Sequence, residues 1–169
     1  MVNNVRSHPL KGEVLASELL CGVPKFIKSG RRRRGAKGVG LRYEAKVQDF
    51  LGAEFDGYIP GPWFKYRTSD EPSRTNYAQP DGIIVDIERG QITICEMKYR
   101  HCAEAYFQLV DKYLPIVRKF FNNSEIWTYA TVEIVHWYDC AVAFPTQVTL
   151  RDDVARVRPN ELAVHVCRP

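Results

Sequence analysis

Two short apolar runs on either side of a glycine-containing turn constrain the fold of this chain more than any other feature. Ile83–Ile87 and Ile92–Tyr99 are rich in β-branched residues, and Glu88–Gln91 separates them. Runs of this kind around a short turn with glycine are typical of a β-hairpin. We therefore predict two adjacent antiparallel strands, the first of which opens at Asp81.

Helices are predicted before and after this hairpin. Residues 41–51 show apolar residues at helical spacing, and residues 103–121 show the longer pattern of a helix packed on a core, with a kink expected at Pro115. A weaker helical pattern covers residues 13–21. On the first helix, the side that we expect to pack on the core carries Leu41, Ala45, Val47, Gln48 and Leu51.

Further strands are predicted at residues 63–66, 127–138 and 161–167. The main order of elements is then αβββαβ, which favours an α/β fold of three layers with a mixed central β-sheet flanked by helices. A chain of 169 residues has the size of one domain. We divide it into a basic, partly flexible leader over residues 1–38 and a single domain over residues 39–169.

Positive charge is concentrated near the N-terminus. The net charge is +4, yet residues 25–46 hold nine basic residues against Glu44 alone. Such a segment attracts a polyanion, most often a phosphate backbone, although a solvated arm and a nuclear localisation signal are alternatives. The residues that we predict to contact DNA are Arg31, Arg32, Arg33, Arg34, Lys37 and Arg42, together with Lys65, Arg67 and Arg74 ahead of Asp81.

Several classes of protein are not expected. No apolar run approaches the roughly 18 residues that cross a bilayer, and the N-terminus lacks the apolar region and cleavage site of a secretory signal. The five cysteines form no CxxC pair, which argues against a zinc finger and favours reduced thiols. Glycine-rich motifs for nucleotide phosphates are missing too. We expect an intracellular, cytoplasmic protein, located in the host cytoplasm if its source is viral.

Two carboxylates and a lysine interrupt the apolar hairpin. Asp81 opens the first strand, and the second strand carries Glu96 and, two residues later, Lys98. Because side chains alternate along a strand, Glu96 and Lys98 point to the same side. Charged groups inside an apolar strand are costly unless a ligand, a metal or each other compensates them. Two carboxylates and a lysine suit a Mg2+ or Mn2+ ion that activates water against a phosphodiester, so these residues are candidates for catalysis.

These residues resemble the PD-(D/E)xK nuclease superfamily. Pro80-Asp81 matches the first half of its motif, and Glu96-Met97-Lys98 matches the second half. The resemblance covers roughly residues 38–138 and is closest in style to small Holliday-junction resolvases and phage-type nucleases. It implies a restriction-endonuclease-like core and a Mg2+-dependent deoxyribonuclease, more an endonuclease than an exonuclease, with specificity for a junction, flap or end. Those resolvases act as dimers, so a homodimer is implied as well.

The resemblance also implies roles for individual residues. Asp81 and Glu96 would bind the metal, and Lys98 would orient or help to deprotonate the attacking water. Glu44 on the first helix would hold a second metal or a metal-bound water, and Gln108 on the later helix would position one of these groups. Catalytic candidates are thus Asp81, Glu96, Lys98, Glu44 and Gln108, and metal ligands are Asp81, Glu96 and Glu44.

Alternatives remain open at the outer positions. Glu44 could belong to an ordinary i,i+4 pair with Gln48, and Gln108 could simply face solvent. The chain departs from a QxxxY pattern found in the family, because Lys112 takes the fourth position after Gln108 and Tyr113 comes one residue later. A non-catalytic DNA-binding or packaging module that has kept the nuclease fold is the alternative function.

Overall fold

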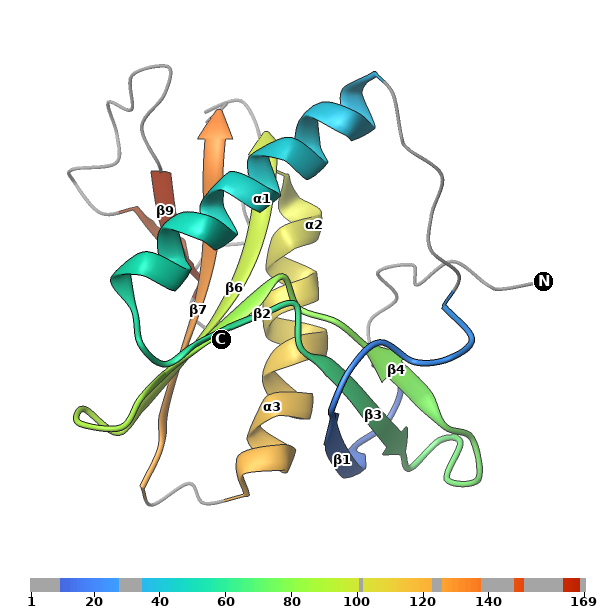
Figure 1. The fold of residues 1–169 in the computed structure, drawn as a ribbon. Helices are drawn as coiled ribbons and strands as arrows, with labels where there is room; N and C mark the ends of the chain where they lie inside the picture. Colours follow the sequence, from blue (N-terminus) through green and yellow to red (C-terminus); the bar gives the residue numbers. More distant parts are fainter. Residues whose placement is uncertain are drawn as a thin grey trace.

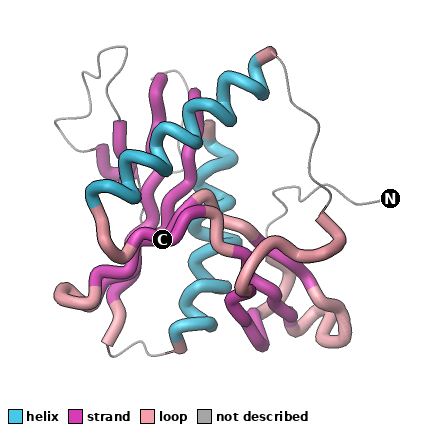
Figure 2. The backbone as a smooth tube through the Cα atoms, viewed as in Figure 1, coloured by secondary structure: helices cyan, strands magenta, loops and turns pink. Residues whose placement is uncertain are grey.

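The computed structural model describes residues 10–27, 35–100, 102–122, 126–137, 148–150 and 163–167. They form an α/β fold with two β-sheets, one mixed and one antiparallel, and with helices on both faces of the mixed sheet (Figure 1, Figure 2). Within these ranges, no helix has the length and apolar character needed to cross a membrane.

The mixed sheet has six strands in the order β2-β5-β6-β7-β9-β8. Its centre is the predicted hairpin, because β5 and β6 pair antiparallel from Gly82↔Cys95 to Asp86↔Gln91. Next to it, β7 runs parallel to β6, and β9 pairs antiparallel with β7. The bounds are β2 Tyr58–Pro60, β5 Gly82–Asp86, β6 Gln91–Arg100, β7 Thr128–Trp137, β8 Val148–Leu150 and β9 Ala163–Cys167. The hairpin and the strands predicted at residues 127–138 and 161–167 are confirmed.

The two faces of β6 pack on different helices. Cys95 and Met97 point toward helix α1 (Ala36–Glu54) and form one apolar cluster with it. Ile92 and Ile94 point to the opposite face, where the helical stretch after β6 covers the sheet. This stretch consists of α2 (Ala103–Tyr106), the π-helical segment η1 (Phe107–Tyr113) and α3 (Leu114–Phe121). Helix, sheet and helix therefore make three layers around the hairpin, as the α/β prediction requires.

The N-terminal part of the chain differs from the prediction. Residues 13–21 were expected to be helical, but Val14–Leu20 form strand β1. It pairs with β3 (Trp63–Thr68), which pairs in turn with β4 (Asn76–Ala78), so these strands form a separate antiparallel sheet beside α3 (Figure 1). The helix prediction is wrong because pairing with β3 and burial of Val14 outweigh the local helical preference of Leu, Ala and Glu. The predicted order αβββαβ is also incomplete. It lacks strand β1, and it places the strand now seen as β3 in the central sheet, whereas β3 lies in the separate antiparallel sheet.

Helix α1 buries only part of the side that was predicted, because Val47 and Leu51 are buried as expected and Gln48 is half-buried. Tyr43, Val47 and Leu51 are buried at a spacing of four residues, whereas Leu41 and Ala45 are exposed. Tyr43 decides the difference, because its ring reaches Tyr99 of β6 and His136 of β7 and sets the rotation of the helix on the sheet. The helix also begins at Ala36, five residues before the expected start and inside the segment assigned to the leader.

The helical stretch at residues 103–121 is confirmed, with an irregular centre. In η1 the backbone bonds run between residues five apart, and the last of them joins the Leu114 amide to the Leu109 carbonyl. Pro115 lies in the first turn of α3, directly after this change of register. Proline cannot donate the next backbone bond of a helix, so its position is compatible with the point where the spacing changes. Short π segments of this kind occur often at functional sites.

Candidate active site

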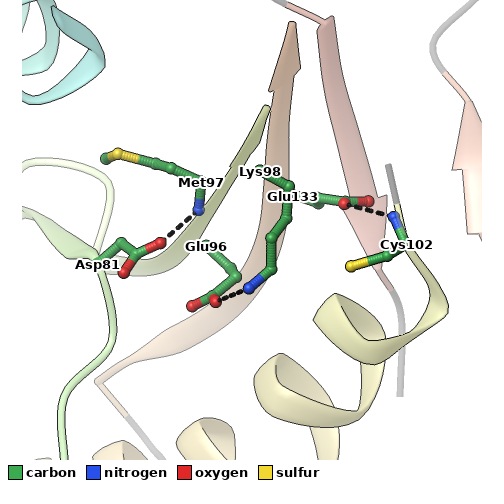
Figure 3. Close-up of polar contacts among 6 residues, drawn as sticks. All are labelled: Asp81, Glu96, Met97, Lys98, Cys102 and Glu133. Atoms are coloured by element: carbon green, nitrogen blue, oxygen red, sulfur yellow. Dashed lines mark hydrogen bonds and ion pairs between the residues drawn. The ribbon is translucent and has the colours of Figure 1, made fainter. Parts of the chain in front are cut away.

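The hairpin brings Asp81 next to the strand that carries Glu96. Asp81 lies directly before β5, and its neighbour Gly82 is paired with Cys95. Oδ2 of Asp81 accepts a hydrogen bond of 2.7 Å from the backbone amide of Met97 (Figure 3). This bond fixes the Asp81 carboxylate against the middle of β6, between the positions of Glu96 and Lys98.

Glu96 and Lys98 form an ion pair on one side of β6. The Lys98 ammonium donates to Oε1 of Glu96 at 2.6 Å, and Figure 3 shows both side chains on the same side of the strand. The predicted alternation along β6 is therefore confirmed for these residues. Glu96 is only 3% exposed, and its second oxygen, Oε2, has no hydrogen-bond partner in the part of the chain that the structure describes. A buried carboxylate oxygen without a partner is costly and calls for a ligand.

Burial raises the pKa values of both the Asp81 and the Glu96 carboxyl groups. Burial, with a further contribution from Asp81, raises the pKa of Glu96 to about 8, although Lys98 acts in the opposite direction. Burial also raises the pKa of Asp81 above its ordinary value, against the opposing effects of the Met97 amide and Lys98. For Lys98, burial lowers the pKa, but the charge and hydrogen bond of Glu96 together with the charge of Asp81 act in the opposite direction, and the net shift is upward. The site therefore contains more carboxyl groups than the single positive charge of Lys98 can compensate.

Glu44 faces the same site from helix α1. Burial raises the pKa of Glu44 to about 7, and Asp81 adds to the increase while Lys98 opposes it. The alternative i,i+4 contact is present too, because Gln48 Nε2 lies 3.5 Å from Oε1 of Glu44. The same amide nitrogen donates to the Asp81 backbone carbonyl at 3.3 Å. Gln48 thus ties Glu44 and the Asp81 backbone together, a connection that the sequence analysis missed.

Glu133 is a further acidic residue that the sequence analysis missed. It lies on β7 in register with Glu96 and is fully buried. Its Oε1 accepts a hydrogen bond of 3.3 Å from the Cys102 amide, which precedes α2 (Figure 3). Burial raises the pKa of Glu133 to about 8, against the Cys102 amide and Lys98. A glutamate within the apolar run from Thr131 to Val135 was the available signal, because the same pattern had marked Glu96.

The π-helical segment η1 covers the face of the sheet opposite to α1, and it carries three polar side chains that bear on the site. Gln108 is half-buried, and its Oε1 has no hydrogen-bond partner among the described residues. Lys112 and Tyr113 are buried. Burial raises the pKa of Tyr113, and Glu96 and Asp81 raise it further, so its hydroxyl lies within the field of both carboxylates. Because π-type bonds join residues five apart, the spacing of Gln108 and Tyr113 in η1 corresponds to the four-residue spacing of an α-helix.

The oxygen donors at the hairpin fit a hard divalent cation. Among the described residues, no three His, Cys, Asp or Glu side chains are grouped closely enough to hold a metal by themselves. Mg2+ does not need such a group, because it keeps several waters and binds through one or two carboxylates together with substrate phosphate. Asp81 and Glu96 could supply these carboxylates, and the Oε2 atom of Glu96 without a partner is available for this purpose.

The predicted DNA-contacting residues are distributed over two regions. Lys37 and Arg42 are exposed on α1. Lys65 and Arg74 form ion pairs with Glu18 and Glu71 at 3.5 and 2.9 Å, whereas Arg67 is exposed on β3. Arg31, Arg32, Arg33 and Arg34 lie outside the described residues. A polar groove of about 300 Å³ between β1, β3 and the segment before β4 is lined by Ala16, Ser17, Glu18, Lys65, Tyr66, Arg67, Ser73 and Thr75.

Comparison of the chain with protein-family models, with curated proteins and with solved structures gives no match.

Proposed function

We propose that this protein is a divalent-metal-dependent nuclease that hydrolyses phosphodiester bonds in DNA. One observation carries the proposal. The hairpin holds the Asp81 carboxylate by the Met97 amide at 2.7 Å and holds Glu96 against Lys98 at 2.6 Å, while Oε2 of Glu96 is left buried without a partner among the described residues. The arrangement supports the metal-binding roles that the resemblance to the PD-(D/E)xK superfamily implies for Asp81 and Glu96.

The charge balance of the site supports a divalent cation. Three carboxyl groups, from Glu44, Asp81 and Glu96, are raised in pKa by burial, and the ammonium of Lys98 pairs with Glu96. Ionised carboxylates in a buried site are stabilised by metal coordination or by close pairing with opposite charge. A Mg2+ or Mn2+ ion would supply the missing positive charge, and it would also supply Lewis acidity toward the phosphate and acidify a water.

The protein side chains would have separate roles in metal binding, charge stabilisation and proton transfer. Asp81 and Glu96 would hold the ion, and the Met97 amide keeps the Asp81 carboxylate oriented for this. Lys98 would steady the negative charge that develops on the phosphate, or orient the water. Glu44 has a pKa of about 7, so near neutral pH it could accept a proton from a water. Gln48 keeps Glu44 close to the Asp81 backbone.

DNA would be bound by exposed cations on α1 and β3. Lys37 and Arg42 project from α1, and Arg67 projects from β3. The sequence also has a basic tract at positions 31–34, and such a tract suits a phosphate backbone. Endonucleolytic cleavage, preference for a junction, flap or end, and action as a homodimer are part of the same proposal.

The test is cleavage of a labelled panel of linear, nicked, forked and four-way DNA with Mg2+, with Mn2+ and with EDTA. We expect metal-dependent cleavage by the wild-type protein and its loss in Asp81→Asn and Glu96→Gln. Asp86→Asn is the matched control, because Asp86 ends the same strand, β5, and pairs with Arg89 at 3.4 Å in the turn. Cleavage that persists in Glu96→Gln contradicts the proposal. Binding of DNA without cleavage by the wild-type protein would favour the non-catalytic module.

A further inference from the structure

Lys112 is a buried cation that the roles proposed above do not use. It lies in η1, is 5% exposed, and has its ammonium 5.7 Å from the centre of the Tyr113 ring. Its ammonium forms no ion pair and no hydrogen bond with the residues that the structure describes. A lysine is almost never buried without a partner, so this position requires an explanation.

Unsatisfied polar groups lie on both elements that meet near Lys112, strand β6 and segment η1. Oε2 of Glu96 and Oε1 of Gln108 are both buried without a hydrogen-bond partner among the described residues. Burial lowers the pKa of Lys112, the nearby Glu96 carboxylate acts in the opposite direction, and η1 packs against β6. A divalent ion with its waters would satisfy the two oxygens, but it would leave the ammonium of Lys112 without an acceptor. An anion with several oxygens is the group that would satisfy the ammonium.

The π-helical register places Lys112 on this side of the helix. In η1, bonds between residues five apart widen each turn, so positions four and five residues after Gln108 lie on either side of it on the next turn. These positions are Lys112 and Tyr113, and both are buried. Gln108 is half-buried, so the same face of η1 extends to the solvent-accessible rim of the site.

We propose that Lys112 is a second cationic residue of the site, and that it binds a non-bridging oxygen of the phosphate held between β6 and η1. The inference rests on the proposed nuclease function and adds a residue to it. Lys98 is already paired with Glu96 at 2.6 Å, whereas Lys112 has no such partner among the described residues. The competing explanation is that Lys112 serves only as an internal counter-charge for Glu96.

The first test is the salt dependence of DNA binding. A fluorescent duplex would be titrated in Ca2+, which replaces Mg2+ without the need for cleavage, at several salt concentrations. Lys112→Met should weaken binding by about ten- to a hundredfold, because hydrogen bonds to charged groups contribute about 1.5–3 kcal/mol. It should also reduce the slope of log K against log salt by about 0.9, the value for one phosphate contact. Lys119→Met, on α3, is the matched control and should leave the slope unchanged.

Thermal unfolding distinguishes the two explanations. If Lys112 binds a phosphate, its ammonium has no partner in the protein without DNA. Replacing it by the apolar Met side chain then leaves the melting temperature of the free protein unchanged or raises it. If Lys112 is a counter-charge for Glu96, Lys112→Met lowers the melting temperature near pH 8 and leaves the salt slope as in the wild type. That second pattern overturns the proposal. Lys112→Arg keeps the charge and should keep the slope, and a loss of slope in this variant would contradict the proposal even if Lys112→Met did not fold.

A double-mutant cycle, with one change in the protein and the other in the DNA, tests which phosphate Lys112 contacts. A neutral methylphosphonate would replace the phosphate at the cleavage position, and binding would be measured with the wild type, with Lys112→Met and with Lys119→Met. Non-additive losses for Lys112→Met support contact with that phosphate, whereas additive losses contradict it. A wild-type protein that does not cleave, but shows the Lys112-dependent slope, refutes the nuclease function and leaves the phosphate contact. Cleavage with an unchanged slope in Lys112→Met refutes the contact alone.

Discussion

Replacement of Glu96 by glutamine should remove a large part of the pH dependence of stability. Glutamine has the shape of the protonated glutamic acid, so the variant behaves as a protein in which Glu96 never ionises. Burial raises the pKa of Glu96 from its ordinary value of 4.5 to about 8. A carboxyl group whose pKa is raised on folding stabilises the folded state fully below its unfolded pKa, and this stabilisation is lost as the pH rises through the folded pKa.

The expected magnitude follows from that pKa. One pKa unit corresponds to about 1.4 kcal/mol, so ionisation of Glu96 costs the metal-free wild type at most about 5 kcal/mol of unfolding free energy between pH 4.5 and pH 8. Part of this cost is shared with Asp81, whose carboxylate raises the pKa of Glu96. Glu96→Gln should therefore match the wild type near pH 4.5 and exceed it in stability by a few kcal/mol at pH 8.

Urea unfolding in EDTA at pH 4.5, 6 and 8 measures this difference directly. Asp86→Asn is the control, because it removes a carboxylate of the same hairpin that is paired with Arg89 at the turn. Saturating Mg2+ at pH 8 should stabilise the wild type by about 2.7 kcal/mol at a hundred times the Kd and should have little effect on Glu96→Gln. A difference between Glu96→Gln and the wild type that does not change with pH would refute the electrostatic reasoning.

Three further predictions test other parts of the structure. Binding of Mn2+ at pH 7 should release on the order of one proton, because Glu96, one of the two proposed ligands, has a pKa of about 8 and must ionise to bind; calorimetric heats that do not depend on the ionisation enthalpy of the buffer would contradict this. Val14→Ala should cost about 2 kcal/mol, because Val14 is 4% exposed within the core, whereas Leu15→Ala, at a 45% exposed position, should cost little in urea unfolding; equal losses would show that β1 is not part of the folded unit. Gly90→Ala should cost about 1–2 kcal/mol, because Gly90 has a φ of 59° and an added Cβ would lie 2.7 Å from the Ile126 carbonyl oxygen. Gly52→Ala in α1 has room and should be neutral or stabilising by thermal unfolding, so a comparable loss there would contradict the argument.

The hairpin and the pair of residues on one side of β6 could be predicted because both depend on local pattern. Alternation with a period of two places Glu96 and Lys98 together wherever the strand lies in the fold. The helix at residues 103–121 was predictable for a similar reason, since its apolar spacing is sustained over many residues. These are features in which one stretch of sequence contains all the information needed.

The parts that were missed depend on partners far away in the sequence. Strand β1 is a strand because β3 pairs with it, and the rotation of α1 follows from the contact of Tyr43 with β6 and β7. Glu133 reaches the site only through the parallel register of β7 with β6. Lys112 could not be assigned from an α-helical spacing, because η1 follows a different one.

The backbone around Glu96 is held by more strand pairing than the backbone around Asp81. Glu96 lies in a strand with hydrogen-bonded neighbours on both sides, β5 and β7, so its Cα is held in place by the ladder of the sheet. Asp81 precedes β5 and is joined to β6 through its side chain. An ion with a larger radius than Mg2+, such as Ca2+, would therefore have to be accommodated by movement of the chain around Pro80 and Asp81. Discrimination between ions by size would then depend on the stiffness of that short connection from β4 to β5.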